Sequence, residues 1–148
     1  MRVIIIGAGI GGTSAAIALG RLGHDVHVYD QIRENRPVGA ALSLWPNGVK
    51  VLNWLGLGDE VAALGGRMDY MAYVDGLDGD EMCRFSLDPV TRQTGQRAYP
   101  VARADLQALL MDRVGADRIH LGMRMTGISE ADDEVTVTFE DGSTAQAD

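Results

Sequence analysis

VIIIGAGIGGTSAAIALGRLGHDVHVYD, residues 3–30, decides the fold of this chain. The unbroken β-branched run at residues 3–6 predicts a strand that is buried on both faces. Small and apolar residues at helical spacing across residues 10–22 predict a helix, which Gly23 would end in a left-handed cap. Residues 26–29 predict a second strand. This order predicts a βαβ unit, with parallel strands and a right-handed crossover.

The glycine loop, residues 7–12 (Gly7, Ala8, Gly9, Ile10, Gly11 and Gly12), fits the pattern G-x-G-x-x-G between a strand and a helix. Gly7 allows the sharp turn, Gly9 lets a pyrophosphate approach the backbone, and Gly12 lets the helix pack closely on the strand. The exposed N–H groups and the helix dipole would hold the phosphates. The alternative is a glycine-rich turn with a purely structural role.

Asp30 ends the second predicted strand and completes the dinucleotide-binding fingerprint. Its carboxylate can accept two hydrogen bonds from the diol of a ribose. The pattern does not choose between NAD and FAD, and it names no reaction. A bound 2′-phosphate is disfavoured by charge repulsion, so we do not expect NADP in this site.

The remaining sequence predicts an α/β fold: a Rossmann-type parallel sheet with a small antiparallel hairpin component. Helices are expected at residues 47–57, 59–64 and 104–114, and strands at 70–74, 81–86, 118–121, 135–139 and from 144 onward. In the helix at 47–57, Asn47 is the expected N-cap, and Val51, Leu52 and Leu55 are expected to face inward. The end of the chain at Asp148, inside the last of these strands, suggests an N-terminal fragment.

Composition narrows the classes of function. A formal charge of −8, from 21 acidic and 13 basic residues, argues against a protein that coats nucleic acid. The single cysteine, Cys83, cannot form a disulfide within the chain, and we expect a buried thiol. Three scattered histidines lack metal-ligand spacing, so no metal site is predicted. The apolar run at residues 3–6 is too short for a membrane span or a signal peptide, which predicts a cytoplasmic protein.

Four segments, residues 3–30, 36–48, 55–59 and 100–106, together resemble the N-terminal part of the FAD-dependent aromatic hydroxylases. These are the flavoprotein monooxygenases similar to p-hydroxybenzoate hydroxylase. The resemblance covers nearly the whole chain in the same order. Within the family, residues 39–50 together with Met71-Ala72-Tyr73 favour members that act on a urate-like purine.

The resemblance implies which residues bind FAD. Gly9, Gly11 and Gly12 would bind the pyrophosphate, within a loop that also contains Gly7 and Ile10. The other implied contacts are Asp30 with the adenosine ribose, Gln31 beside it, Ser43 on the flavin side of the pyrophosphate, Arg103 near the phosphates or ribitol, and the Met125 backbone with adenine. For Arg103 the alternative is a solvated residue at a helix start.

Two departures from the family pattern accompany the resemblance. Where many members have Glu-Arg, this chain has Asp30-Gln31, which keeps the acid and drops the base. Where many have Gly-Ala-Gly, it has Gly39-Ala40-Ala41, which alters the clearance there.

The resemblance further implies that residues 1–148 are an incomplete FAD-binding region, whose substrate domain and later FAD motifs lie beyond residue 148. No catalytic residue is assigned, and the 148 residues alone are expected to be inactive. The parent would be a monooxygenase that hydroxylates a small aromatic or purine substrate with NADH or NADPH and O₂. No nucleic-acid or membrane partner is expected. Formation of a homo-oligomer is left as an open alternative. The alternatives are another FAD- or NAD-dependent oxidoreductase, such as an amine oxidase or flavin reductase, and a stand-alone nucleotide-binding module.

Overall fold

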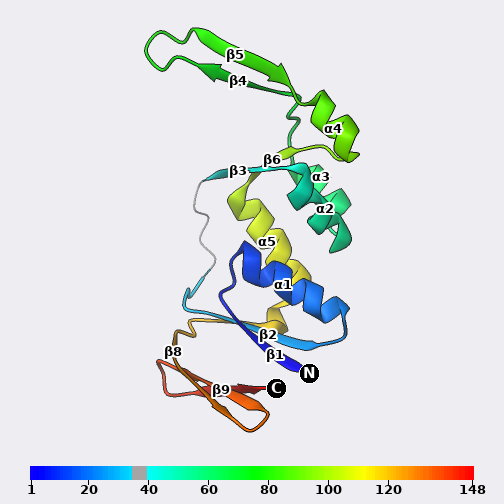
Figure 1. Ribbon diagram of the computed structural model, residues 1–148. Helices are drawn as coiled ribbons and strands as arrows, with labels where there is room; N and C mark the ends of the chain where they lie inside the picture. The colour runs from blue at the N-terminus through cyan, green and yellow to red at the C-terminus, as the bar shows by residue number, and fades with distance from the viewer. Residues whose placement is uncertain (35–39) are drawn as a thin grey trace. The chain divides into compact units, whose positions relative to one another are not determined.

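The computed structural model describes residues 1–34 and 40–148, which form two compact units (Figure 1). The first unit contains residues 1–38 and 104–148, and the second contains residues 39–103. The first unit is therefore built from two separate stretches of the chain. Within the resemblance noted above, residues 36–39 fall outside the described residues.

A parallel sheet is the centre of the first unit. Strand β1 (Arg2–Ile6), helix α1 (Ile10–Arg21) and strand β2 (Asp25–Asp30) form the predicted βαβ unit. Strand β7 (Ile119–Leu121) pairs in parallel with the other edge of β2, which gives the order β1-β2-β7. Gly23 has a φ of 86°, so the predicted left-handed residue after the helix is confirmed.

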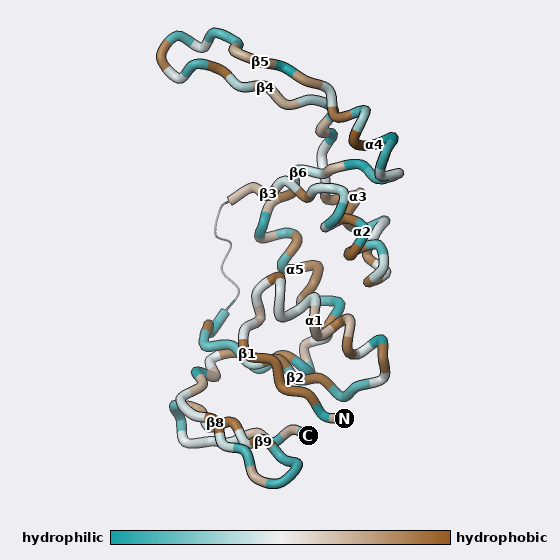
Figure 2. Tube along the Cα trace, in the orientation of Figure 1, coloured by the Kyte–Doolittle hydropathy of each residue, from teal (hydrophilic) through white to brown (hydrophobic). Residues whose placement is uncertain are grey.

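The core of the first unit lies between this sheet and its helices. Its buried members are Ala8, Ala16, Val26 and Val28, and the partly buried residues packed on them are Val3, Ile5, Leu19, Val114, Ile119 and Leu121. Figure 2 shows the apolar colour along β1, whose residues 3–6 are all valine or isoleucine. The small side chains explain how α1 can lie close to the strands.

A second, antiparallel sheet completes the first unit, with the order β10-β9-β8. It consists of β8 (Met125–Ala131), β9 (Glu134–Phe139) and β10 (Thr144–Ala147). Strand β8 was not predicted, because it is mostly exposed and polar and its pairing slips at a bulge between Met125 and Gly127. The Asp148 N–H donates to the Arg2 carbonyl at 3.2 Å, which links the end of β10 to β1.

The second unit contains two antiparallel strand pairs and short helices. Strand β3 (Ala41–Leu44) pairs with β6 (Tyr99–Ala102), and β4 (Tyr70–Val74) pairs with β5 (Glu81–Ser86) as the predicted hairpin. The helices are α2 (Pro46–Trp54), α3 (Gly58–Leu64) and α4 (Asp88–Thr94). Helix α5 (Arg103–Val114), preceded by β6, leads back into the first unit, where a 3₁₀ turn (Ala116–Arg118) precedes β7.

Three local predictions were wrong. Helix α2 begins with Pro46 after Trp45 as the N-cap residue, because proline is preorganised for the first helical position; Asn47 is not the cap. The buried side of α2 consists of Pro46, Val49 and Leu52, so Val51 faces outward with 54% of it exposed. Cys83 is exposed on β5, since both faces of that hairpin are open.

The α/β class is confirmed, but the antiparallel part is larger than the single hairpin that was expected. Among the described residues, no helix is both long enough and apolar enough to cross a membrane.

Candidate functional site

The glycine loop joins β1 to α1 and ends at a helix N-terminus that no side chain caps. Gly9 is the N-cap residue, and the first turn of α1 contains no acidic side chain. The Thr13 hydroxyl instead donates to the Gly9 carbonyl at 2.9 Å, which closes the first turn from within. The backbone N–H groups and the positive end of the helix dipole are therefore directed at the loop, with no carboxylate in the first turn of α1 to compete for them.

Space around the loop glycines distinguishes two roles. A Cβ on Gly12 would lie 1.9 Å from the Gly7 carbonyl oxygen, so α1 can approach β1 only because this residue is glycine. A Cβ on Gly9 or on Gly11 would meet nothing within 4 Å. The loop therefore has a tightly packed inner side and an open outer side, and that arrangement fits a phosphate-bearing cofactor.

Asp30 lies at the carboxyl end of β2 beside the glycine loop. Its Oδ2 accepts the Ala8 N–H at 2.6 Å, and its Oδ1 accepts the Ile32 N–H at 2.9 Å. The Gly7 N–H donates to the Tyr29 carbonyl at 2.7 Å, which ties the loop to the same strand end. Each carboxylate oxygen can accept further hydrogen bonds, so both remain able to receive a ribose hydroxyl.

Gln107 is a site residue that sequence reasoning missed. It is only 6% exposed, lies on α5, and its Nε2 donates to the Ala8 carbonyl at 3.1 Å. Ala8 is therefore held on both sides, at its N–H by Asp30 and at its carbonyl by Gln107. The available signal was an amide between Leu106 and Leu110 on the apolar face of a helix, where an unpaired polar group is costly.

A cavity of about 320 Å³, which we call the Asp30 pocket, opens beside that carboxylate. Its walls come from the ends of β1 and β2 and from the β7–β8 connection; the lining residues are Ile6, Gly7, Asp30, Gln31, Met123, Arg124 and Met125. The predicted residues Gly7, Asp30, Gln31 and Met125 thus share one cavity. Met125 borders the bulge in β8, and its contact with adenine stays a prediction.

Ser43 and Arg103 belong to the second unit. Ser43 is exposed on β3, opposite Pro100 on β6, and the Arg103 N–H donates to the Ala40 carbonyl at 2.8 Å. Ser43 thus lies on β3, and Arg103 begins α5 directly after β6, the strand that pairs with β3. Their roles toward a cofactor stay predictions, as do those of the residues in the glycine loop.

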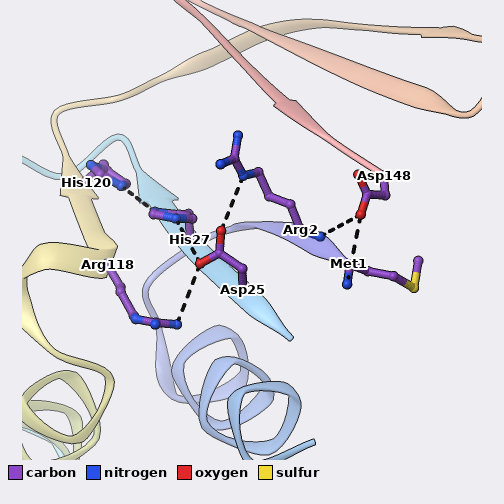
Figure 3. Close-up of polar contacts among 7 residues, drawn as sticks. All are labelled: Met1, Arg2, Asp25, His27, Arg118, His120 and Asp148. Carbon is purple, nitrogen blue, oxygen red and sulfur yellow. Dashed lines mark hydrogen bonds and ion pairs between the residues drawn. The ribbon is translucent and has the colours of Figure 1, made fainter. Parts of the chain in front are cut away.

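Two histidines that seemed unrelated in sequence meet across β2 and β7. His27 Nδ1 lies 3.1 Å from His120 Nε2, and the His27 Nε2 lies 3.4 Å from Asp25 (Figure 3). The His120 ring stacks on Tyr29, with centroids 4.5 Å apart, and Tyr29 stacks in turn on Phe139 of β9. The stack thus joins the two sheets of the first unit.

Burial lowers the pKa of His120 below its ordinary value, and the nearby His27 lowers it further. Burial alone would raise the pKa of Asp25, but a hydrogen bond from Arg2 and the charges of His27, Arg2 and Arg118 hold it below its usual range. In the described part of the chain, no group of three or more potential metal-binding side chains comes together.

Comparison with known proteins agrees with this geometry. A family model described as FAD binding domain matches residues 1–148. An FAD-dependent urate hydroxylase of Mycolicibacterium vanbaalenii is 55% identical over 150 residues, which cover 100% of this chain and 38% of the relative. A 6-hydroxynicotinate 3-monooxygenase of Bordetella bronchiseptica is 34% identical, covering 99% of this chain and 39% of its own length.

Among solved structures, HpxO of Klebsiella pneumoniae, crystallised with FAD and uric acid, superimposes with a TM-score of 0.92 at 47% identity. The match covers 100% of this chain and 37% of that protein. The chain therefore spans well under half the length of these relatives. The expected resemblance to flavoprotein hydroxylases, including the likeness to those that act on urate, is confirmed.

Proposed function

The chain belongs to the FAD binding domain family, and on that premise we propose that it is the FAD-binding part of a flavin-dependent monooxygenase. The observation that carries the proposal is the likeness to urate hydroxylases along the whole chain, over a glycine loop whose outer side is open. The complete protein would hydroxylate a small aromatic or purine ring, with a urate-like purine as the favoured substrate.

The residues of the first unit would bind the ADP half of FAD. The uncapped start of α1 would hold the pyrophosphate at the open faces of Gly9 and Gly11. Asp30 would accept the ribose hydroxyls, because its two backbone donors fix the carboxylate at the pocket wall. Gln107 would hold the glycine loop in place through its hydrogen bond to the Ala8 carbonyl.

Bound FAD supplies the redox chemistry of such enzymes, which passes electrons from NADH or NADPH to O₂. This chain's contribution is to fix the position of the cofactor, since a small displacement at the ADP end would carry through to the ring that reacts. Ser43 and Arg103 would contact the cofactor from the second unit. The proposal also keeps three expectations from the sequence. Residues 1–148 would be an incomplete FAD-binding domain, the protein would be cytoplasmic, and it would have no nucleic-acid or membrane partner.

The test is a substrate panel on the complete protein. Urate, 6-hydroxynicotinate, salicylate and hydroxybenzoates are supplied in turn, and NAD(P)H oxidation is followed together with product formation. We expect urate to stimulate NAD(P)H oxidation and to be consumed. Hydroxylation of a phenol or pyridine with no response to urate would overturn the proposal of a urate-like substrate. The proposal of a flavin-dependent monooxygenase would stand.

Titration of ADP and FAD against the apoprotein separates the remaining alternatives. Binding of both, with turnover of a ring substrate, supports the proposal. Binding without turnover of any of the ring substrates favours another oxidoreductase or a nucleotide-binding module. Failure to bind either ligand would overturn the proposal.

A further inference from the structure

The lining of the Asp30 pocket includes a cationic side chain, whose role the dinucleotide-binding fingerprint does not explain. Among the residues that line the pocket, Arg124 carries the positive charge and Asp30 the negative charge. The position after Asp30 holds Gln31, which is uncharged. The guanidinium therefore comes from the β7–β8 connection, on a different wall from the carboxylate.

The backbone around Arg124 is anchored from both sides. The Met123 N–H donates to the Asp30 carbonyl and the Glu140 N–H donates to the Arg124 carbonyl, both at 2.8 Å. The Gly122 N–H donates to the Ile32 carbonyl at 2.7 Å. These bonds tie Arg124 to the end of β2, where Asp30 lies. The side chain therefore starts from a fixed point on the pocket wall, which reduces the entropy lost when it orders on a ligand.

The Arg124 guanidinium has no ion pair or hydrogen bond within residues 1–34 and 40–148. Arg2 and Arg118, in the same unit, both lie within ion-pair distance of Asp25, at 3.3 and 3.9 Å. An arginine without a partner beside a pocket is available to a ligand, because its planar group can stack on a ring as well as donate hydrogen bonds.

The location of the pocket indicates which part of a ligand Arg124 would meet. Gly9, Gly11 and Gly12 do not line the cavity, whereas Asp30 and Met125 do. The pocket therefore borders the carboxylate that would hold the ribose, whereas Gly9 and Gly11, where a pyrophosphate would sit, are not part of its lining. We infer that the base is the group that would occupy this space.

We propose that Arg124 stacks its guanidinium on the adenine ring of the bound dinucleotide and so contributes to recognition of the ADP half. The inference rests on the proposed function, since it needs FAD in this site. A cation over a purine face gains from the π electrons and from contact area. Loss of the guanidinium should weaken binding of ADP and FAD by the same factor, about 3- to 30-fold.

The experiment titrates ADP, adenosine and FAD against the complete apoprotein by calorimetry, at low and at high salt. Arg124→Ala and Arg124→Gln should weaken all three ligands at both salt concentrations, and Arg124→Trp, which restores a planar group, should recover most of the affinity. Arg118→Gln is the matched control, because it removes the same charge from the opposite end of β7. Circular dichroism verifies that each variant is folded.

Suppose that the unsubstituted complete protein binds ADP and FAD. Unchanged affinity of folded Arg124→Ala for both ligands would then overturn this inference and leave the proposed function standing. A loss confined to ADP and FAD, absent for adenosine and abolished by salt, would also overturn it, since it would indicate a phosphate contact. If the parent protein binds neither ADP nor FAD, the inference and the proposed function fail together.

Discussion

Gly11 and Gly12 are adjacent in α1, and replacing each with alanine should have opposite effects on stability. Alanine favours a helix over glycine by up to about 1 kcal/mol at either position. A Cβ on Gly11 meets nothing within 4 Å, so Gly11→Ala should keep that gain. A Cβ on Gly12 would lie 1.9 Å from the Gly7 oxygen, 3.1 Å from the Gly7 carbon and 3.2 Å from the Ile5 Cγ2.

The obstruction at Gly12 is backbone, so the chain cannot relieve it by turning a side chain. Helix α1 must move away from β1, and the contacts of the core around Ala8 and Ala16 loosen. Overpacking of this kind costs roughly 1–3 kcal/mol, which exceeds the gain in helix propensity. The gain in helix propensity is common to both variants and cancels, so we expect the free energy of unfolding of Gly12→Ala to lie about 1–3 kcal/mol below that of Gly11→Ala.

Urea denaturation followed by circular dichroism measures this difference directly, because both variants share one helix and one buffer. In thermal melts, each kcal/mol should move the Tm by about 2–4 °C for a chain of this size. Equal stability of the two variants, or a Gly12→Ala protein as stable as the parent, would refute the argument that Gly12 is required for close packing of α1.

Four further predictions concern cofactor binding, packing and pH. Gly9→Val should leave the melting temperature nearly unchanged, because the space there is open, but should abolish FAD binding measured by flavin fluorescence. Asp30→Ala should weaken FAD binding by on the order of 1.5–3 kcal/mol in a titration of the apoprotein; unchanged affinity would remove Asp30 from the site. Gln107→Leu should lower the free energy of unfolding by about 1–3 kcal/mol, because the Ala8 carbonyl loses its donor; a neutral effect in urea melts would contradict this. His120 has a lowered pKa, so its contribution to stability is present above its ordinary value of 6.5 and is lost as pH falls below it. Thermal melts at a series of pH values from 8 to 5 should show that His120→Phe loses less stability on acidification than the unsubstituted protein does. His24→Gln should behave as the unsubstituted protein.

Local patterns predicted the part of the fold in which sequence neighbours are also spatial neighbours. The β1-α1-β2 unit follows from the β-branched run, the glycine loop and Gly23, each of which acts within a few residues. The short strands β3 and β6 and the exposed strand β8 escaped prediction, because few of their residues are buried and the pattern is weak.

Site residues divide in the same way. Asp30 was found because its spacing from Gly7 is part of a known fingerprint. Gln107 and Arg124 were missed, because each depends on a contact between distant segments: Gln107 with Ala8, and Arg124 with the pocket beside Asp30. The approach of His27 to His120, separated by 93 positions, likewise has no local signal.

The discontinuous first unit has a consequence for biosynthesis. Strand β2 has its partner β1 at once, but its other edge pairs with Ile119–Leu121, which the ribosome adds roughly 90 residues later. At about 5–20 residues per second, that edge is exposed for on the order of 5–20 s while the second unit emerges. An unpaired strand edge rich in valine is a template for pairing with another chain. Nascent chains of this protein should therefore depend on chaperones most strongly in the interval before β7 leaves the ribosome.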